Sequence, residues 1–421
     1  MPLPPQIESS SVGHCQSLGL YLSIPFCRSK CTYCNFASGV YPASHHDQYV
    51  ERLVGDLRAS GSQAAERGLH LPQTVDSIYF GGGTPVLLSS AHFHTIFRAI
   101  GEIFALTAEA EITVECAPGQ LSDSTLDALV ACGVNRVSLG AQSFIDRECA
   151  TSGRLHTRAD VLTDLKRLRT AGIENLNLDL LAGLAGQTIH SWRESIDILL
   201  QTGVPHASVY MLEIDEDSRL GRELLQGGAR YYAGLVPSDE TIADMYETAI
   251  ELFSSAGLAQ YEISNFARPG FASRHNLRYW CRAPYLGLGV DASSMLFAEE
   301  NADEPTPASL RLTTTSSLDD YLAGITPLAE QSWLGPVQQM EEFWFLGLRR
   351  NSGVAVTDLM HLFGAEAAQP SLAVAHRLVA EGLLCFERHA ERFTLSPRGR
   401  LLSNNVFAEF LAAYPDPATS L

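Results

Sequence analysis

The stretch LYLSIPFCRSKCTYCNF occupies residues 20–36 and decides how the rest of the chain can be interpreted. It begins inside a β-rich run, 18–24, and then places Cys27, Cys31 and Cys34 on one tight loop, with three and then two residues between them. Three thiolates can hold three irons of a 4Fe–4S cluster. Since no fourth cysteine follows at short range, one iron would stay open for an outside ligand.

Two other interpretations of these cysteines stay open at this point. His45 or His46 could complete a zinc site, or the three cysteines could be unrelated core residues. Paired cysteine spacings in zinc sites usually recur further along the chain, and they do not recur here. The spacing therefore favours the cluster.

Six β-rich runs alternate with segments of helical spacing. Apolar residues recur at helical intervals in 49–58, 125–133 and 161–172. Strands followed by helices across short turns form a parallel sheet, so we expect an α/β fold. The six runs cover residues 18–24, 75–80, 111–115, 134–140, 173–181 and 206–212.

Polar residues or glycines stand at the C-terminal ends of these runs. The first run leads into the three cysteines, and the second leads into Gly81–Thr84. Glu115 ends the third run, Gln142 follows the fourth, and Asp179 lies in the fifth. The C-terminal ends of parallel strands share one rim in an α/β barrel, so we expect these groups to form one site.

The glycines after the second run also suggest a kind of ligand. Without side chains, Gly81, Gly82 and Gly83 leave backbone N–H and C=O groups open to a ligand that carries an amino and a carboxylate group. The run lacks the G-x-G-x-x-G spacing of a dinucleotide site and the lysine of a P-loop. This argues against NAD and ATP.

The composition limits partners and compartment. Among 421 residues, 29 Lys+Arg stand against 48 Asp+Glu, a net charge of −19. Such a field repels nucleic acid and anionic lipid over most of the surface, although it is compatible with one small basic pocket for an acidic ligand. The nine cysteines, an odd number, do not suggest a disulfide scaffold. We find no signal peptide or bilayer-spanning run, so we expect a cytoplasmic protein.

The chain divides into five expected parts. These are a flexible tail (1–17), a barrel (18–240), an extension of the barrel (241–297), a linker or loop (298–335) and a small helical domain (336–421). In the last part, a helix at 372–384 followed by a two-stranded wing resembles a winged helix. Residues 338–421 carry seven Arg, no Lys and nine acids, a net charge of 7 − 9 = −2. This favours a packing or docking role over DNA binding.

Taken together, the motifs are similar to those of radical S-adenosylmethionine (SAM) proteins. More narrowly, they resemble the oxygen-independent coproporphyrinogen III oxidase (coproporphyrinogen dehydrogenase) family and its HemW haem-chaperone branch. The resemblance covers about residues 18–410 and implies a partial (β/α)6 radical-SAM barrel with a small C-terminal helical, winged-helix-like domain. The matching stretches are LYLSIPFCRSKCTYCNF, IYFGGGTP, ITVECAPG, VSLGAQSF, NLDLLAGLAGQT, YEISNFARPG, RHNLRYW, YLGLG and LSPRGRLLSNNV.

The resemblance also implies roles for individual residues, none of them a catalytic side chain. Cys27, Cys31 and Cys34 would bind the cluster, and its open iron would take the amino and carboxylate groups of SAM. Reduction of the cluster would cleave SAM to methionine and a 5′-deoxyadenosyl radical. The positions that match SAM-contacting residues of the family are Tyr21, Tyr33, Gly82, Gly83, Thr84, Glu115, Gln142, Arg154 and Asp179.

The choice of branch depends on a few positions. Porphyrinogen-oxidising members have a fourth cysteine where this chain has Phe36, and they carry a longer N-terminal stretch. The segment RHNLRYW resembles the motif proposed for haem contact in the chaperone branch, with His275 as an iron ligand and Tyr279 and Trp280 stacking nearby. The alternative is that His275 is structural. The chain departs from the branch at Ser23, where histidine is common.

The resemblance therefore implies a haem chaperone. Such a protein binds a 4Fe–4S cluster, SAM and haem or a porphyrin, and delivers haem to a membrane or respiratory partner. Oxygen-independent coproporphyrinogen III oxidation in porphyrin biosynthesis is the alternative. Methyl transfer or RNA modification suits so acidic a chain less well. A cluster or zinc protein that has lost SAM binding is hard to reconcile with the retained residues.

Overall fold

A computed structural model describes residues 16–299, 307–324, 328–411 and 413 of the chain. The predicted flexible tail, 1–17, falls almost entirely outside the described residues, and Ser17 already belongs to the first strand. No described helix is both long enough and apolar enough to cross a membrane.

Six parallel strands form the centre of a curved sheet. They are neighbours in chain order, as the alternation of strand and helix predicted. Buried leucines, valines and isoleucines fill their apolar positions, as expected for strands covered on both faces. The strands are β1 (Ser17–Ile24), β3 (Thr74–Gly82), β4 (Ala105–Cys116), β5 (Arg136–Gln142), β6 (Asn175–Ala182) and β7 (His206–Met211).

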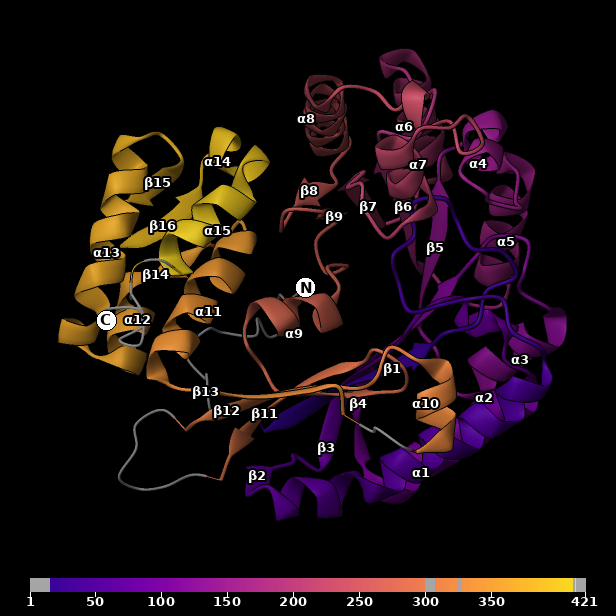
Figure 1. Cartoon of the computed structure of the whole chain (residues 1–421), viewed down its shortest axis with the longest axis horizontal. Coiled ribbons are helices and arrows are strands. Elements are labelled where there is room, and N and C mark those ends of the chain that lie inside the picture. The colour runs from indigo at the N-terminus through magenta and orange to yellow at the C-terminus, as the bar shows by residue number, and fades with distance from the viewer. Residues whose placement is uncertain (1–15, 300–306, 325–327, 412, 414–421) are drawn as a thin grey trace.

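The connecting helices lie along the outer, convex side of this sheet (Figure 1). Side-chain caps fix where several of them begin: Ser89, Ser122 and Thr188 each accept a backbone N–H of the first turn. This confirms the expected partial (β/α)6 barrel. The helices are α1 (Ser44–Glu66), α2 (Ser90–Ile103), α3 (Asp123–Ala131), α4 (Asp146–Thr151), α5 (Arg158–Thr170), α6 (Ile189–Thr202) and α8 (Asp239–Ser255). The expected boundary at residue 240 falls inside α8.

Further strands extend both edges of the sheet, which has thirteen strands among the described residues. One edge continues through β10 (Tyr285–Leu288), parallel to β1, and then β11 (Ser293–Ala298), β12 (Ser309–Thr313) and β13 (Glu330–Leu334), which are antiparallel. The short β2 (Leu69–His70) pairs with β11. The other edge continues from β7 through β9 (Asn265–Ala267) to β8 (Ala259–Gln260).

The prediction of a linker or loop over 298–335 is wrong for the described part of that segment. It holds β12, β13 and the short helix α10 (Leu318–Ala323). Its Thr, Ser and acidic residues indicate a loop by composition. However, β11 offers an open edge, and pairing with it satisfies the backbone groups of β12. Edge pairing in the folded sheet outweighed local composition.

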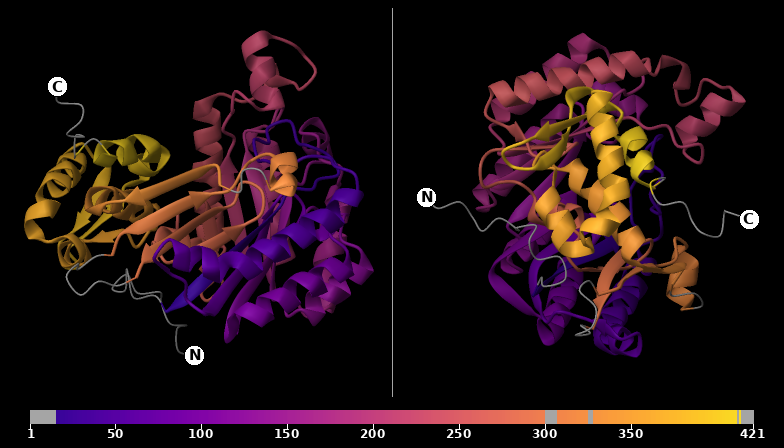
Figure 2. Two further views of the ribbon diagram at one scale, coloured as in Figure 1. Left: turned by 60° about the horizontal axis from the view of Figure 1, so that its bottom comes forward. Right: turned by 90° about the vertical axis from the view of Figure 1, so that its left-hand side faces the viewer.

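The C-terminal part forms a separate small domain with its own core around Trp344, Leu359, Leu378 and Phe393. Figures 1 and 2 show it as a distinct body beside the barrel. The predicted helix and two-stranded wing are present as α13, β15 and β16. Its elements are α11 (Pro336–Arg349), β14 (Val354–Ala355), α12 (Val356–Phe363), α13 (Ala365–Ala380), β15 (Leu384–Glu387), β16 (Arg392–Leu395), α14 (Pro397–Leu401) and α15 (Ser403–Leu411).

Candidate functional site

A cavity of about 320 Å³ opens at the C-terminal ends of the parallel strands. The strand ends meet there because all six strands run in the same direction. This first cavity brings together most of the residues that the sequence singled out. Its lining includes Cys27, Cys31, Tyr33, Cys34, Gly82, Gly83, Thr84, Glu115, Gln142, Arg154 and Asp179.

The cysteine loop leaves β1 and folds back on itself. The backbone N–H of Cys27 donates to the carbonyl of Gly39 at 2.8 Å, and Lys30 Nζ donates to the carbonyls of Phe36 and Ser38, each at 3.0 Å. All three thiols are free, and burial raises the pKa of the Cys27 thiol. The loop thus holds three unpaired sulfur atoms at the cavity wall, as a cluster with one open iron requires.

The zinc alternative finds no support in the geometry. Within the described ranges, no three His, Cys, Asp or Glu side chains converge as the ligands of a single metal ion. The ring of His46 packs against Phe26, with 4.1 Å between the ring centroids, and burial lowers its pKa. His46 is therefore a packing residue.

The glycines after β3 are needed for close packing against the cysteine loop. A Cβ atom on Gly83 would lie 2.7 Å from the carbonyl oxygen of Phe26, and Gly82 has a φ of +100°. The N–H of Gly83 donates to the Ile24 carbonyl at 2.8 Å, and that of Thr84 donates to the Phe26 carbonyl at 2.7 Å. The N–H groups of Gly83 and Thr84 are therefore already used by β1 and the cysteine loop, whereas a role for the carbonyl groups of these glycines in ligand binding stays a prediction.

Two carboxylates face the first cavity. The hydroxyl of Tyr79 donates to Glu115 Oε1 at 2.9 Å, and burial raises the pKa of Glu115 to about 7. Burial also raises the pKa of Asp179, although Asn177 donates to it at 2.7 Å and Ser138 at 3.2 Å. Among the described residues neither carboxylate forms an ion pair. A ligand with an ammonium group and hydroxyls would complete their hydrogen bonding.

Arg154 supplies the positive charge on the cavity wall. Its Nη2 and Nε donate to the hydroxyl of Tyr33 at 3.1 and 3.3 Å. These hydrogen bonds join the segment between β5 and α5, which contains Arg154, to the cysteine loop, since Tyr33 lies between Cys31 and Cys34. A guanidinium held in this way suits a ligand carboxylate.

Sequence reasoning missed the residues behind the carboxylates. Tyr79, Ser138, Asn177 and Ser208 are hydrogen-bonded to Glu115, to Asp179 or to one another. A signal for them existed, because Asn177 and Asp179 alternate along β6 and so share one face of the sheet. Strand register then brings Ser138 beside Asn177 and Ser208 beside Asp179.

Tyr21 does not lie in the first cavity. It lines a second cavity of about 310 Å³ on the concave side of the sheet. Its ring stacks at 6.1 Å on that of Tyr79. A Cβ atom on Gly81 would lie 3.1 Å from both the Tyr21 ring and Glu115 Oε1, so Tyr21 borders this carboxylate of the first cavity and its contact with SAM stays a prediction. The other lining residues are Tyr279, Trp280, Tyr285, Asp291, Ser293, Arg311 and Leu346.

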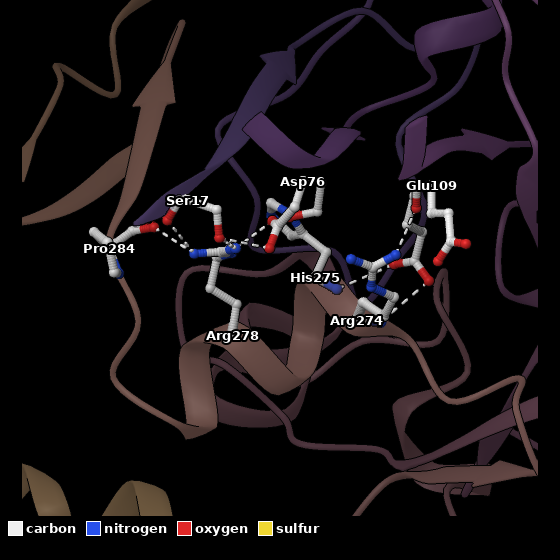
Figure 3. A network of polar contacts seen from close by, with 9 residues as sticks. Ser17, Asp76, Glu109, Arg274, His275, Arg278 and Pro284 are labelled. Carbon is white, nitrogen blue, oxygen red and sulfur yellow. Dashed lines mark hydrogen bonds and ion pairs between the residues drawn. The ribbon is translucent and has the colours of Figure 1, made fainter. Parts of the chain in front are cut away.

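The segment RHNLRYW forms α9 (Arg274–Trp280), which lies between the sheet and the C-terminal domain (Figure 1). Figure 3 shows the polar network that holds it. Arg278 pairs with Asp76 of β3 and donates to the Ser17 carbonyl at 3.0 Å. Glu111 of β4 accepts the first backbone N–H groups of the helix, among them that of His275 at 3.0 Å.

His275 is fully buried in this network, and both of its ring nitrogens are engaged. Nδ1 lies 3.0 Å from Ser77 Oγ, and Nε2 lies 2.8 Å from the hydroxyl of Tyr279. Burial lowers the pKa of His275 to about 3, so the ring is neutral. Binding of an iron atom would require His275 to give up one of these hydrogen bonds. The geometry agrees better with the structural alternative.

The comparisons with known proteins agree with the resemblance that the sequence motifs carry. Residues 21–199 match the radical SAM superfamily, and residues 334–402 match the HemN C-terminal domain. The protein named "Heme chaperone HemW" of Lactococcus lactis is 33% identical over 93% of this chain and 96% of its own length. Its Bacillus subtilis namesake is 32% identical over 93% and 98%. The mouse protein named "Radical S-adenosyl methionine domain-containing protein 1, mitochondrial" is 30% identical over 91% and 84%.

Among solved structures, the coproporphyrinogen III oxidase HemN of Escherichia coli superposes with a TM-score of 0.77. It is 22% identical and covers 94% of this chain and 90% of its own, which supports the fold. Radical SAM membership implies a 4Fe–4S cluster and SAM, which together supply reductive cleavage of SAM when bound. The three free thiols and the half-satisfied carboxylates of the first cavity fit both groups. The chain belongs to the HemW family of radical SAM proteins.

Proposed function

We propose that this protein binds haem and delivers it to an acceptor protein, with a 4Fe–4S cluster and SAM in the first cavity. The observation that carries the proposal is similarity over more than nine-tenths of the chain to several proteins named as haem chaperones. The chain also covers nearly the whole length of those proteins. We propose further that the acceptor is a membrane or respiratory haem protein and that the transfer takes place in the cytoplasm.

Phe36 supports this proposal over porphyrinogen oxidation. It stands two residues after Cys34, where the porphyrinogen-oxidising members have a cysteine, and its side chain is 60% exposed at the mouth of the first cavity. An exposed phenylalanine offers no thiolate.

The second cavity is where we propose that haem makes contact. Tyr279, Trp280 and Tyr285 give it an aromatic wall, and such faces suit a flat porphyrin ring. Arg311 lines the same cavity, and its guanidinium would suit a propionate. Arg311 is held there by Glu342, at 2.8 Å between Nη2 and Oε1.

His275 has a different role in this proposal from the one that the motif suggests. It lies behind Tyr279, whose hydroxyl it holds, so we propose that it positions Tyr279 and does not ligate iron. Two variants test the proposed haem contact and the role of His275. Trp280→Ala should weaken haem binding about tenfold or more, because it removes an aromatic face from the wall.

His275→Ala should lower the free energy of unfolding by about 1–3 kcal/mol while leaving the visible spectrum of bound haem unchanged. A shifted spectrum would instead identify His275 as the iron ligand. Trp333→Ala, at an exposed tryptophan outside the cavity lining, is the control.

One anaerobic experiment tests the proposed function as a whole. The cluster is reconstituted, and one sample is assayed for haem binding, for transfer of haem to an apo-haemoprotein, and for conversion of coproporphyrinogen III with SAM and a reductant. Haem binding and transfer without conversion are expected. Formation of protoporphyrinogen would overturn the proposal in favour of the oxidase, despite Phe36.

A further inference from the structure

A short segment after β7 stands out from the barrel and exposes apolar side chains. It comprises α7 (Arg219–Gln226) and the turn that follows, up to Val236, and in both views of Figure 2 it projects beyond the body of the barrel. Its exposed fractions are 54% for Leu224, 64% for Leu225, 45% for Tyr232 and 53% for Leu235. Such a group on a protruding element marks a contact surface.

Three arginines line a pocket on the same segment. The pocket has a volume of about 450 Å³ and is lined by Arg219, Arg222 and Arg230 together with the backbone of Gly227 and Gly228. Arg219 Nη1 donates to the Lys30 carbonyl at 3.1 Å. The Arg230 guanidinium lies over the ring of Tyr231, with 5.4 Å between its central carbon and the ring centroid.

No carboxylate neutralises these arginines within the part of the chain that the structure describes. Among the described residues, Arg222 donates to the main-chain carbonyls of Ser218 at 3.4 Å and Asp217 at 2.8 Å. Glu223 also lines the pocket, but its two oxygens accept the backbone N–H groups of Tyr231 at 2.7 Å and Ala233 at 3.1 Å. The pocket therefore has a surplus of positive charge.

This local charge is unusual for the chain as a whole, whose net charge is −19. Apart from Glu223, the nearest acidic residues in sequence, Asp215, Glu216 and Asp217, precede α7, whereas Leu224, Leu225 and Arg230 lie in its C-terminal half or beyond it. Asp215 is hydrogen-bonded to Asn35 of the cysteine loop at 3.1 Å. This bond holds Asp215 against the cysteine loop.

We propose that the α7 segment docks the protein on a membrane surface, with a phospholipid phosphate in the three-arginine pocket and Leu224 and Leu225 among the acyl chains. Guanidinium groups and free backbone amides bind phosphate oxygens, and exposed leucines beside them suit the apolar boundary below the headgroups. A free phosphate ligand would make no use of the leucines. The proposal goes beyond haem transfer and does not depend on it.

Flotation of the full chain with lipid vesicles tests this. The protein, without added haem, is mixed with vesicles of phosphatidylcholine alone or with phosphatidylglycerol. Binding is expected only to the vesicles that contain phosphatidylglycerol, and it should weaken as salt is added. Absence of binding to either vesicle would overturn the proposal.

Two double variants test which side chains act. Arg222→Glu with Arg230→Glu should weaken binding about tenfold or more, and Leu224→Asp with Leu225→Asp should do the same. Arg98→Glu and Leu162→Asp, at exposed positions on α2 and α5, are matched controls that should bind like the original chain. Thermal unfolding checks that each variant is folded.

The variants also separate the two sources of phosphate. If the arginine variant loses vesicle binding and the leucine variant does not, the leucines take no part and the proposed docking mode is overturned. If inorganic phosphate at physiological salt competes fully with the vesicles, the pocket binds a free anion and the membrane proposal is overturned. Unchanged binding in both double variants would overturn it as well. These results leave the haem proposal untouched, because haem binding is measured separately.

Discussion

The two cavities differ in how their buried polar groups are satisfied. In the first cavity, Glu115 and Asp179 accept hydrogen bonds from neutral groups only and keep raised pKa values. Around the second cavity, His275 uses both ring nitrogens, and Arg278 pairs with Asp76. Burial and polarity are similar in both places. What separates a ligand site from a structural network is the hydrogen-bonding capacity that the protein leaves unused.

The largest effect should come from the thiols. Replacing Cys27, Cys31 and Cys34 together by alanine removes the sulfur atoms of the cysteine loop, so we expect complete loss of bound iron and sulfide after anaerobic reconstitution. The fold should survive, because these side chains are only partly buried. Cys385→Ala, at an exposed cysteine, should keep the full iron content. Iron retained in the triple variant would show that the first cavity is not the cluster site.

Variants in the hydrogen-bond network around α9 should change the stability of the protein and not its iron content. Arg278→Ala removes a fully buried guanidinium and leaves the half-buried Asp76 with the hydroxyl of Ser17 as a donor, so we expect the free energy of unfolding in urea to fall by about 3 kcal/mol. Arg377→Ala breaks the exposed ion pairs with Glu381 and Glu409 and should cost less than about 1 kcal/mol. A loss below 1 kcal/mol for Arg278→Ala would mean that other contacts hold α9.

Two glutamates with the same raised pKa, one inside the first cavity and one outside it, test the difference between a ligand site and a structural network. Burial raises the pKa of Glu115 and of Glu262 to about 7 from 4.5, but only Glu115 lies in the first cavity. The folded state then binds more protons than the unfolded state between these values, so stability falls as the pH rises from 4.5 to 7. Glu115→Gln and Glu262→Gln should each remove a share of that fall, at most about 3 kcal/mol, in urea unfolding of the SAM-free protein at pH 5 and 8.

Only Glu115→Gln should also weaken SAM binding to the reconstituted protein, as measured by calorimetry. Equal SAM affinity in the two variants would show that Glu115 does not contact SAM. Glu262 forms an isolated β-bridge with Arg350, at the junction between the barrel and the C-terminal domain. Weaker SAM binding in Glu262→Gln would therefore show that this junction influences the first cavity.

Most of the fold follows from local patterns. Apolar runs with helical segments between them predicted all six parallel strands, because the alternation of strand and helix permits few other arrangements. The helix and wing of the C-terminal domain were likewise readable from residues 372–402. The segment 298–335 was not, because β12 and β13 depend on the free edge of β11 more than on their own composition.

The same division holds for the site. By itself the sequence determined the three thiols, their spacing and the polar strand ends. All strands of a parallel sheet run in the same direction, so the groups at their C-terminal ends meet at one rim. Only the tertiary structure decided that Tyr21 and His275 lie outside the first cavity. It also decided that the N–H groups of Gly83 and Thr84 are already occupied. These outcomes depend on partners far away in the chain, such as Ser77 for His275, and a local pattern holds no information about which distant group will use a donor or acceptor.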